Sequence, residues 1–270
     1  IKNEAPWVGY CVMASRHIIN EWVYYDGNST DGTPELLEYI AKKYGLNIRV
    51  FRDKDCKNLQ DDYVRLFDDC LHQVKSDYVI FLHPDMIVTE YPDKFSVKSP
   101  AATVSMQSFG GDPGGRIFKF KEGRTDSWKI IMKNGLGLHY YGHYGSADEG
   151  MYFKAITGEA HYHHDNLALY PYAVEDSGIK VFHYSDVRPY KRRLDRMKES
   201  LKNQNYTVDS VEKGAQDHPR VSLKQSYGFE LEPCSLFPDV FSEYVNEFAS
   251  VLGKKPEDAC WLPIRVKEVA

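Results

Sequence analysis

The sequence predicts an α/β protein with a mixed, mainly parallel sheet, helices on both of its faces and a helical C-terminal extension. Short apolar runs that suit buried strands alternate with amphipathic segments over the first 90 residues. Such an order is typical of parallel sheets, because their crossover connections are helices. The content of 42% hydrophobic and 27% charged residues is that of a globular chain.

Each expected element follows from a local pattern. A helix should start at Pro34, capped by Thr33, and end before Gly45. The other expected helices lie over about 61–75 and 240–252, and a basic helix follows Pro189. The apolar runs expected to be strands are 8–13, 22–25, 48–51, 78–82, 117–120 and 128–132.

Charge, cysteine content and length narrow the class of protein. The 34 Lys and Arg residues stand against 39 acidic residues, so the net charge of -5 gives no general attraction to nucleic acid or anionic lipid. Five scattered cysteines without a C-x-x-C pair indicate neither a disulfide framework nor a structural zinc site, and we expect a cytoplasmic protein without a transmembrane segment. We expect a main domain over 1–190 and an extension over 191–270; the oligomeric state is open.

Acidic residues stand directly after two of the predicted strands. Asp26 and Asp31 belong to the turn after the strand 22–25, where carboxylates can accept from a nucleobase N–H or from ribose hydroxyls. His83 and Asp85 follow the run YVIFL and are two residues apart, so their side chains should share one side of an extended strand and could hold a divalent cation. For each pair, an ordinary turn is the alternative. Ligands of parallel sheets bind beyond the carboxyl ends of the strands.

These motifs, in this order, resemble family-2-type glycosyltransferases of the GT-A fold. Asp26-Gly27-Asn28-Ser29-Thr30-Asp31-Gly32-Thr33 is similar to their D-D-G-S-x-D-G-T turn. His83-Pro84-Asp85 stands where they carry D-x-D, with His83 in place of the first acid. The segment Phe182-His183-Tyr184-Ser185-Asp186-Val187-Arg188-Pro189 resembles a late H-Y-x-x-V-R-P segment of one branch, so the resemblance spans about residues 8–198.

One spacing departs from the family. These enzymes place a full helix between their first strand and the D-G-S turn, whereas a strand over 8–13 would leave only eight residues before Trp22. Either the helix is truncated or a segment near residues 16–19 is missing.

The resemblance implies a metal-assisted, inverting transfer of a sugar from a nucleotide-diphosphate sugar to a hydroxyl of a glycan, a polymer or a modified nucleic acid. It implies Mn²⁺ or Mg²⁺ as the cofactor, held by Asp85, His183 and His83. The acceptor proton would pass to Glu149 or Asp148. The residues for the nucleotide are Asp26, Asp31, Asp53, Arg188 and Lys191, of which the two basic residues could instead belong to a solvated helix face.

Two other functions are kept as alternatives. A sugar-phosphate nucleotidyltransferase would share a nucleotide-binding sheet, but the G-x-G-T-R signature expected near its N-terminus is missing. A non-catalytic glycan- or nucleotide-binding protein with a degenerate site would account for His83 in place of the first acid of D-x-D.

Overall fold

The chain folds into two compact units of mixed α/β structure. The computed structural model describes residues 1–53, 56, 59–111, 117–120, 131–135, 137–141, 150–153, 174–187, 231–233 and 237–262. The first unit comprises Ile1–Met106 and Thr125–Val181, and the second comprises Gln107–Arg124 and Phe182–Ala270. The mixed α/β class is confirmed. The division expected after residue 190 stays a prediction, because residues 188–230 lie outside the described part.

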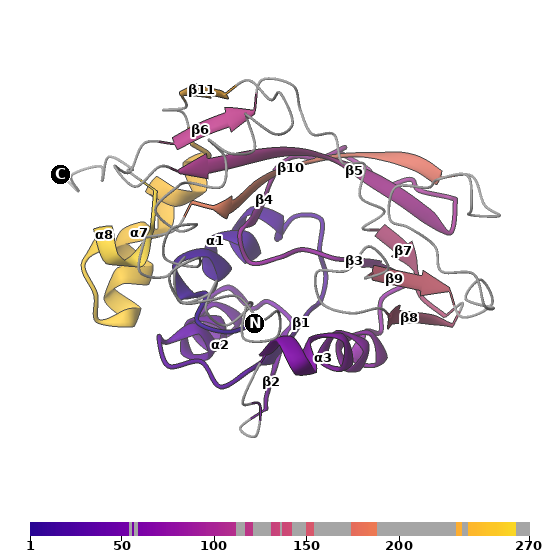
Figure 1. Ribbon diagram of the computed structural model, residues 1–270, viewed down its shortest axis with the longest axis horizontal. Coiled ribbons are helices and arrows are strands. Elements are labelled where there is room, and N and C mark those ends of the chain that lie inside the picture. Colours follow the sequence, from indigo (N-terminus) through magenta and orange to yellow (C-terminus); the bar gives the residue numbers. More distant parts are fainter. Residues whose placement is uncertain are drawn as a thin grey trace, which may run out of the picture. The chain divides into compact units, whose positions relative to one another are not determined.

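The first unit holds most of the described elements (Figure 1). Its helices are α1 (Ala5–Ser15), α2 (Thr33–Tyr44) and α3 (Leu59–Gln73). Its strands are β1 (Trp22–Asp26), β2 (Ile48–Arg52), β3 (Tyr78–Ile80), β4 (Met86–Glu90), β7 (Ile131–Lys133), β8 (Leu138–Tyr141) and β9 (Gly150–Phe153). Two long strands, β5 (Ala101–Gly111) and β10 (Val174–Asp186), begin in this unit and end in the second.

Helix α1 corrects the expected first strand over residues 8–13. The helix has Pro6 in its first turn and is buried on nearly all sides, from Trp7 to Met13. An apolar run without polar positions cannot tell a buried helix from a buried strand. The spacing of eight residues between a strand over 8–13 and Trp22 therefore does not apply, because this segment belongs to the helix before β1, and Ile18 N–H and Ile19 N–H bond to the carbonyl of Ser15 as the chain leaves that helix.

The described strands form three separate sheets, and the expectation of one mixed, mainly parallel sheet is not confirmed. β1 and β2 pair in parallel, from Trp22 opposite Ile48 to Asp26 opposite Arg52. β3, expected to belong to the same parallel sheet, pairs antiparallel with β7, which also pairs antiparallel with β5. β10 lies between β5 and β4, and β8 pairs antiparallel with β9. An apolar run predicts that a strand is buried, but it does not specify the direction of its neighbours.

Two helices pack against the β1–β2 pair, and an apolar core lies on other strands of the unit. α2 packs against β2, and α3 packs against β1 (Figure 1). α2 begins at Thr33 and ends at Gly45, whose φ of 64° is the left-handed conformation common after a helix. An apolar cluster of the unit lies on β4, β5, β7 and β10, and its buried members are Met86, Val88, Ala102, Val104, Met106, Ile131, Ile179 and Val181.

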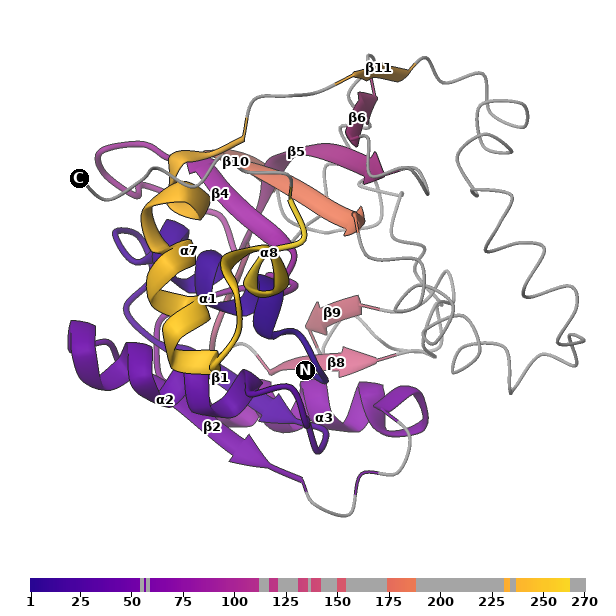
Figure 2. The same ribbon diagram turned by 90° about the vertical axis from the view of Figure 1, so that its left-hand side faces the viewer.

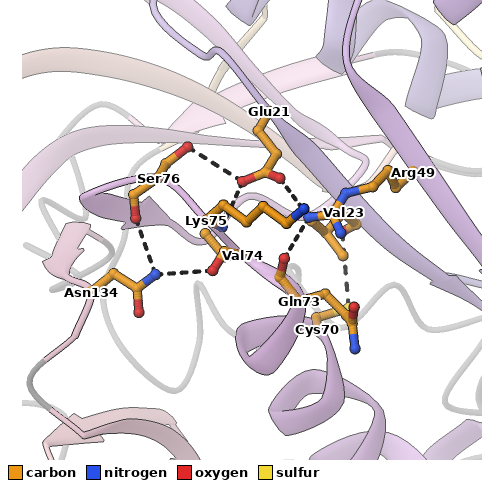
Figure 3. A network of polar contacts seen from close by, with 9 residues as sticks. All are labelled: Glu21, Val23, Arg49, Cys70, Gln73, Val74, Lys75, Ser76 and Asn134. Atoms are coloured by element: carbon orange, nitrogen blue, oxygen red, sulfur yellow. Dashed lines mark hydrogen bonds and ion pairs between the residues drawn. The ribbon is translucent and has the colours of Figure 1, made fainter.

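A polar network connects residues at the amino-terminal end of the β1–β2 pair (Figure 3). The Glu21 carboxylate, 5% exposed, accepts from Arg49 of β2, from the Lys75 backbone N–H at 2.8 Å and from the Ser76 hydroxyl at 3.4 Å. Arg49 also donates to the carbonyl of Gln73 at the end of α3. Burial acts to raise the pKa of Glu21, but these hydrogen bonds outweigh it and lower the pKa below its ordinary value.

The second unit contains β6 (Ile117–Phe120), β11 (Leu231–Pro233), α7 (Asp239–Leu252) and α8 (Pro256–Ala259). β6 pairs antiparallel with the end of β5 and with β11. α7 packs against α8 (Figure 2), and it ends at Gly253 with a φ of 62°. The ring of Tyr184 stacks on Phe109 at 4.8 Å and meets Phe241 edge-on at 5.8 Å. The expected final helix is confirmed.

Candidate functional site

Asp26 ends β1 as a buried carboxylate, 2% exposed. Its Oδ2 accepts from the Ser29 backbone N–H at 3.0 Å, across a turn in which Asn28 takes the left-handed conformation with φ 62°. Its Oδ1 is buried and accepts no hydrogen bond from the described residues. A buried acceptor without a donor is costly, so a donor from beyond the described residues would stabilise it. Asp26 is therefore the strongest single candidate for contact with a ligand N–H or O–H.

Asp31, in the same turn, accepts hydrogen bonds from two other residues of the chain. Its Oδ1 accepts from Thr33, from the backbone N–H at 3.0 Å and from the hydroxyl at 2.5 Å, and its Oδ2 accepts from the Ala5 backbone N–H at 3.0 Å. The carboxylate thereby caps the first turns of both α1 and α2. The sequence suggested Thr33 as the cap, but the helix already begins at Thr33 and Asp31 supplies the oxygen.

This capping also decides what the start of α2 can bind. In dinucleotide-binding folds, a phosphate sits at the helix that follows the first strand of the unit. Here the Asp31 carboxylate takes that place, bonded to the first residue of α2. The start of α2 is therefore already occupied by a carboxylate of the chain itself. Whether Asp31 also contacts a nucleoside stays a prediction.

Asp53 follows β2 and lies beside Asp26. Its backbone N–H donates to the carbonyl of Asp26 at 2.9 Å, one residue beyond the paired residues Asp26 and Arg52. The structure thus brings together two of the acids that the sequence proposed for the nucleotide, at the carboxyl edge of the parallel pair. This edge is where ligands of α/β sheets bind.

Sequence reasoning missed Arg65, a residue of α3 that contacts Asp53. Arg65 Nη2 lies 2.9 Å from Asp53 Oδ2, and its guanidinium also pairs with Asp62 and Asp69 at 3.2 Å each. The hydrogen bonds that Arg65 donates to Asp53 and Asp62 raise the pKa of Arg65, which stays charged. The spacing of Asp62, Arg65 and Asp69 indicates ion pairs on one helix face. The link to Asp53 depends on how α3 packs, which no local pattern reveals.

An aromatic pair lies next to these charges. The rings of Tyr25 and Phe51, opposite each other in the β1–β2 ladder, stack with centroids 5.0 Å apart. Burial, and then the charge of Asp69, raises the pKa of Tyr25 above its usual value, so its hydroxyl stays protonated.

His83, Pro84 and Asp85 form a turn between β3 and β4, which corrects the expected strand geometry. β3 ends at Ile80, and the Met86 backbone N–H donates to the carbonyl of His83 at 2.9 Å. The alternation of side chains along a strand therefore does not apply to His83 and Asp85. Asp85 is buried at 4% exposure, and the His83 ring meets Phe81 edge-on at 4.9 Å.

Cys11 of helix α1 contacts this turn. The thiol donates to the carbonyl of His83 at 3.6 Å. Burial, and then the negative charge of Asp85, raises the pKa of Cys11 to about 12. Cys11 is therefore a protonated packing residue beside Asp85, and it is neither a thiolate ligand nor a nucleophile at neutral pH.

The proposed metal ligands lie on separate parts of the chain. Asp85 and His83 belong to the first unit, whereas His183 lies on β10 in the second. Within the described residues, no group of three or more His, Cys, Asp or Glu side chains is arranged to hold a metal ion. A cation shared by Asp85 and His183 stays a prediction.

Four predicted site residues lie outside the described residues. They are the candidate bases Asp148 and Glu149 and the basic residues Arg188 and Lys191. Their assignments stay predictions.

Comparisons with known proteins add no family to this description. No protein-family model matches the chain, and a search of curated proteins found no match. Among the described helices, none is both long and apolar enough to cross a membrane.

Proposed function

We propose that this chain is a GT-A-type glycosyltransferase that moves a sugar from a nucleotide-diphosphate sugar to a hydroxyl acceptor, with inversion. One observation carries the proposal: Asp26 and Asp53 lie together at the carboxyl edge of a parallel strand pair, and Asp26 keeps a buried oxygen to which no described residue donates. A nucleoside supplies the missing donor, as a nucleobase N–H or a ribose hydroxyl.

A divalent cation, Mn²⁺ or Mg²⁺, would neutralise the diphosphate of the donor. The residues that the resemblance implies for this cation carry suitable ligand atoms. Asp85 offers a carboxylate oxygen, which hard cations require, and His83 and His183 offer imidazole nitrogen, which Mn²⁺ accepts more readily than Mg²⁺. We therefore favour Mn²⁺.

In the proposed reaction, the acceptor oxygen attacks the anomeric carbon of the sugar. The new C–O bond forms as the bond from that carbon to the diphosphate oxygen breaks, and the nucleoside diphosphate leaves with the bonding electrons. Glu149 or Asp148 takes the acceptor proton, and Arg188 and Lys191 neutralise the departing diphosphate. Proton removal of this kind contributes about 10² to 10⁴ in rate.

The test is turnover of nucleotide sugars by the purified chain. A panel of UDP-, GDP- and TDP-sugars is incubated with Mn²⁺, and nucleoside diphosphate release and thermal shift are recorded. We expect one nucleotide class to give both signals, and Asp26→Asn to reduce them, whereas Asp93→Asn, at an exposed acid, should not. Absence of binding and turnover across the panel would contradict the proposal. Pyrophosphate release from a nucleoside triphosphate and a sugar 1-phosphate would instead indicate the nucleotidyltransferase.

A further inference from the structure

Arg65 links the helix α3 to the acid that follows β2. Its guanidinium contacts three carboxylates, those of Asp53, Asp62 and Asp69, at 2.9 to 3.2 Å. The Asp53 side chain is only 19% exposed, while that of Arg65 is 52% exposed. Two of the acids, Asp62 and Asp69, come from the same helix as Arg65 and bind Nε and Nη1 of its guanidinium, which leaves Nη2 to contact Asp53.

The position of Asp53 has a known chemical use in folds of this kind. In a strand-helix-strand unit that binds a nucleotide, an acid at the end of the second strand accepts hydrogen bonds from ribose hydroxyls. β1, α2 and β2 form a strand-helix-strand unit with parallel strands, in which Asp31 caps the start of α2, and Asp53 follows β2 directly. Its backbone bonds to Asp26, which has the buried oxygen without a described donor.

We propose that Arg65 is a positioning residue that holds Asp53 as the acceptor for the ribose hydroxyls, and that this pair makes the protein select ribonucleotides over 2′-deoxyribonucleotides. The inference rests on the proposed nucleotide-sugar function and adds a specificity determinant to it. The ion pair places the positive charge of Arg65 beside the Asp53 carboxylate that would accept from the ribose. The ion pair also restricts the rotation of Asp53, so less entropy is lost when a ribose binds.

Arg52 provides a matched control. It is an arginine of β2 with a side chain 41% exposed, and it pairs with Glu35 and Glu38 at 3.2 and 2.8 Å. Exposed pairs of this kind contribute little to stability, so Arg52→Met and Arg65→Met should both fold and unfold at nearly the same temperature as the wild type. A difference between the two variants in nucleotide selection then reports on Asp53 and not on the loss of a surface charge pair.

The experiment titrates the wild type and the variants with UDP, GDP, ADP and CDP and with their 2′-deoxy counterparts, in the presence of Mn²⁺, by calorimetry. We expect the wild type to bind the best ribonucleotide about tenfold more tightly than its 2′-deoxy form, since a hydrogen bond to a charged group is lost. The ratio should approach one in Arg65→Met and in Asp53→Asn, recover in part in Arg65→Lys, and stay unchanged in Arg52→Met.

The outcomes separate this inference from the proposed function. If the wild type binds a ribonucleotide but the ratio is the same in Arg65→Met, the positioning role of Arg65 is wrong and the nucleotide site stands. If the wild type binds a nucleotide without preferring ribose, the selection itself is refuted. If no nucleotide binds to the wild type, both proposals fail together.

Discussion

Replacing Asp31 with alanine should destabilise the protein, whereas replacing Asp26 with asparagine should mainly weaken nucleotide binding. The two acids are five residues apart in one turn, and the resemblance to glycosyltransferases assigns both to the nucleoside. Asp31 accepts three hydrogen bonds, from Thr33 and Ala5, at the starts of two helices. Asp26 accepts one hydrogen bond from the described residues and is almost fully buried.

The expected loss of stability in Asp31→Ala follows from the two helix starts that Asp31 caps. Loss of a helix cap costs about 0.5–2 kcal/mol, so Asp31→Ala should lower the free energy of unfolding by about 1–4 kcal/mol. For a chain of this size, each kcal/mol lowers Tm by about 2–4 °C. Asp31→Asn keeps an oxygen acceptor and should cost less. Asp26→Asn removes a buried charge, so its Tm should stay the same or rise, while its nucleotide Kd rises about tenfold.

The assay is thermal unfolding of each variant beside calorimetric titration with the best nucleotide, at a temperature where all variants are folded. Asp93→Ala, at an exposed acid, is the control for loss of one negative charge. An unchanged Tm in Asp31→Ala would refute the capping argument. A loss of affinity in Asp31→Ala equal to that in Asp26→Asn, without loss of stability, would return Asp31 to the nucleoside site.

Three further predictions concern stability, thiol reactivity and catalysis. Folding lowers the pKa of Glu21, so its ionised carboxylate stabilises the fold above its pKa in the unfolded chain, about 4.3, and this stabilisation is lost as the pH falls through its pKa in the folded protein. In urea unfolding, Glu21→Gln should lower the free energy of unfolding by about 1–3 kcal/mol at pH 7 and by less below pH 4. The raised pKa of Cys11, about 12, predicts that iodoacetamide leaves it unmodified in native protein at pH 8, and mass spectrometry of digested protein checks this. Glu149→Gln or Asp148→Asn should lower kcat by about 10² or more with donor Kd unchanged, and near-native turnover in both would place the base elsewhere.

Local chemistry made part of the fold predictable. The helix Thr33–Tyr44 follows from turn, proline and glycine signals, and it begins one residue before the expected start at Pro34. The helix α1 was mistaken for a strand, because every residue from Trp7 to Met13 is buried and the sequence carries no period to read. The antiparallel partner of β3 was also missed, since strand direction depends on contacts with β7, about 50 residues later in the chain.

In the candidate site, too, some features follow from local sequence and others depend on tertiary packing. Asp26 and Asp53 follow the two strands of a parallel pair, which end at one edge, so a sequence that reveals both strands also indicates that these acids are neighbours. The roles of the other residues could not be read from spacing. His83 and Asp85 lie on a turn where side-chain alternation fails, and Arg65 reaches Asp53 only through the packing of α3.

The two ends of the β1–β2 pair therefore differ in what their acids do. At the amino-terminal end, Glu21 accepts from Arg49, Lys75 and Ser76, and this network ties β1, β2 and the end of α3 together. At the carboxyl end, Asp26 accepts from Ser29 alone among the described residues. A buried carboxylate with several donors stabilises a fold, whereas one that lacks them weakens it unless a ligand completes its hydrogen bonds. Nucleotide binding should consequently raise Tm through Asp26, and the rise should be lost in Asp26→Asn but kept in Glu21→Gln.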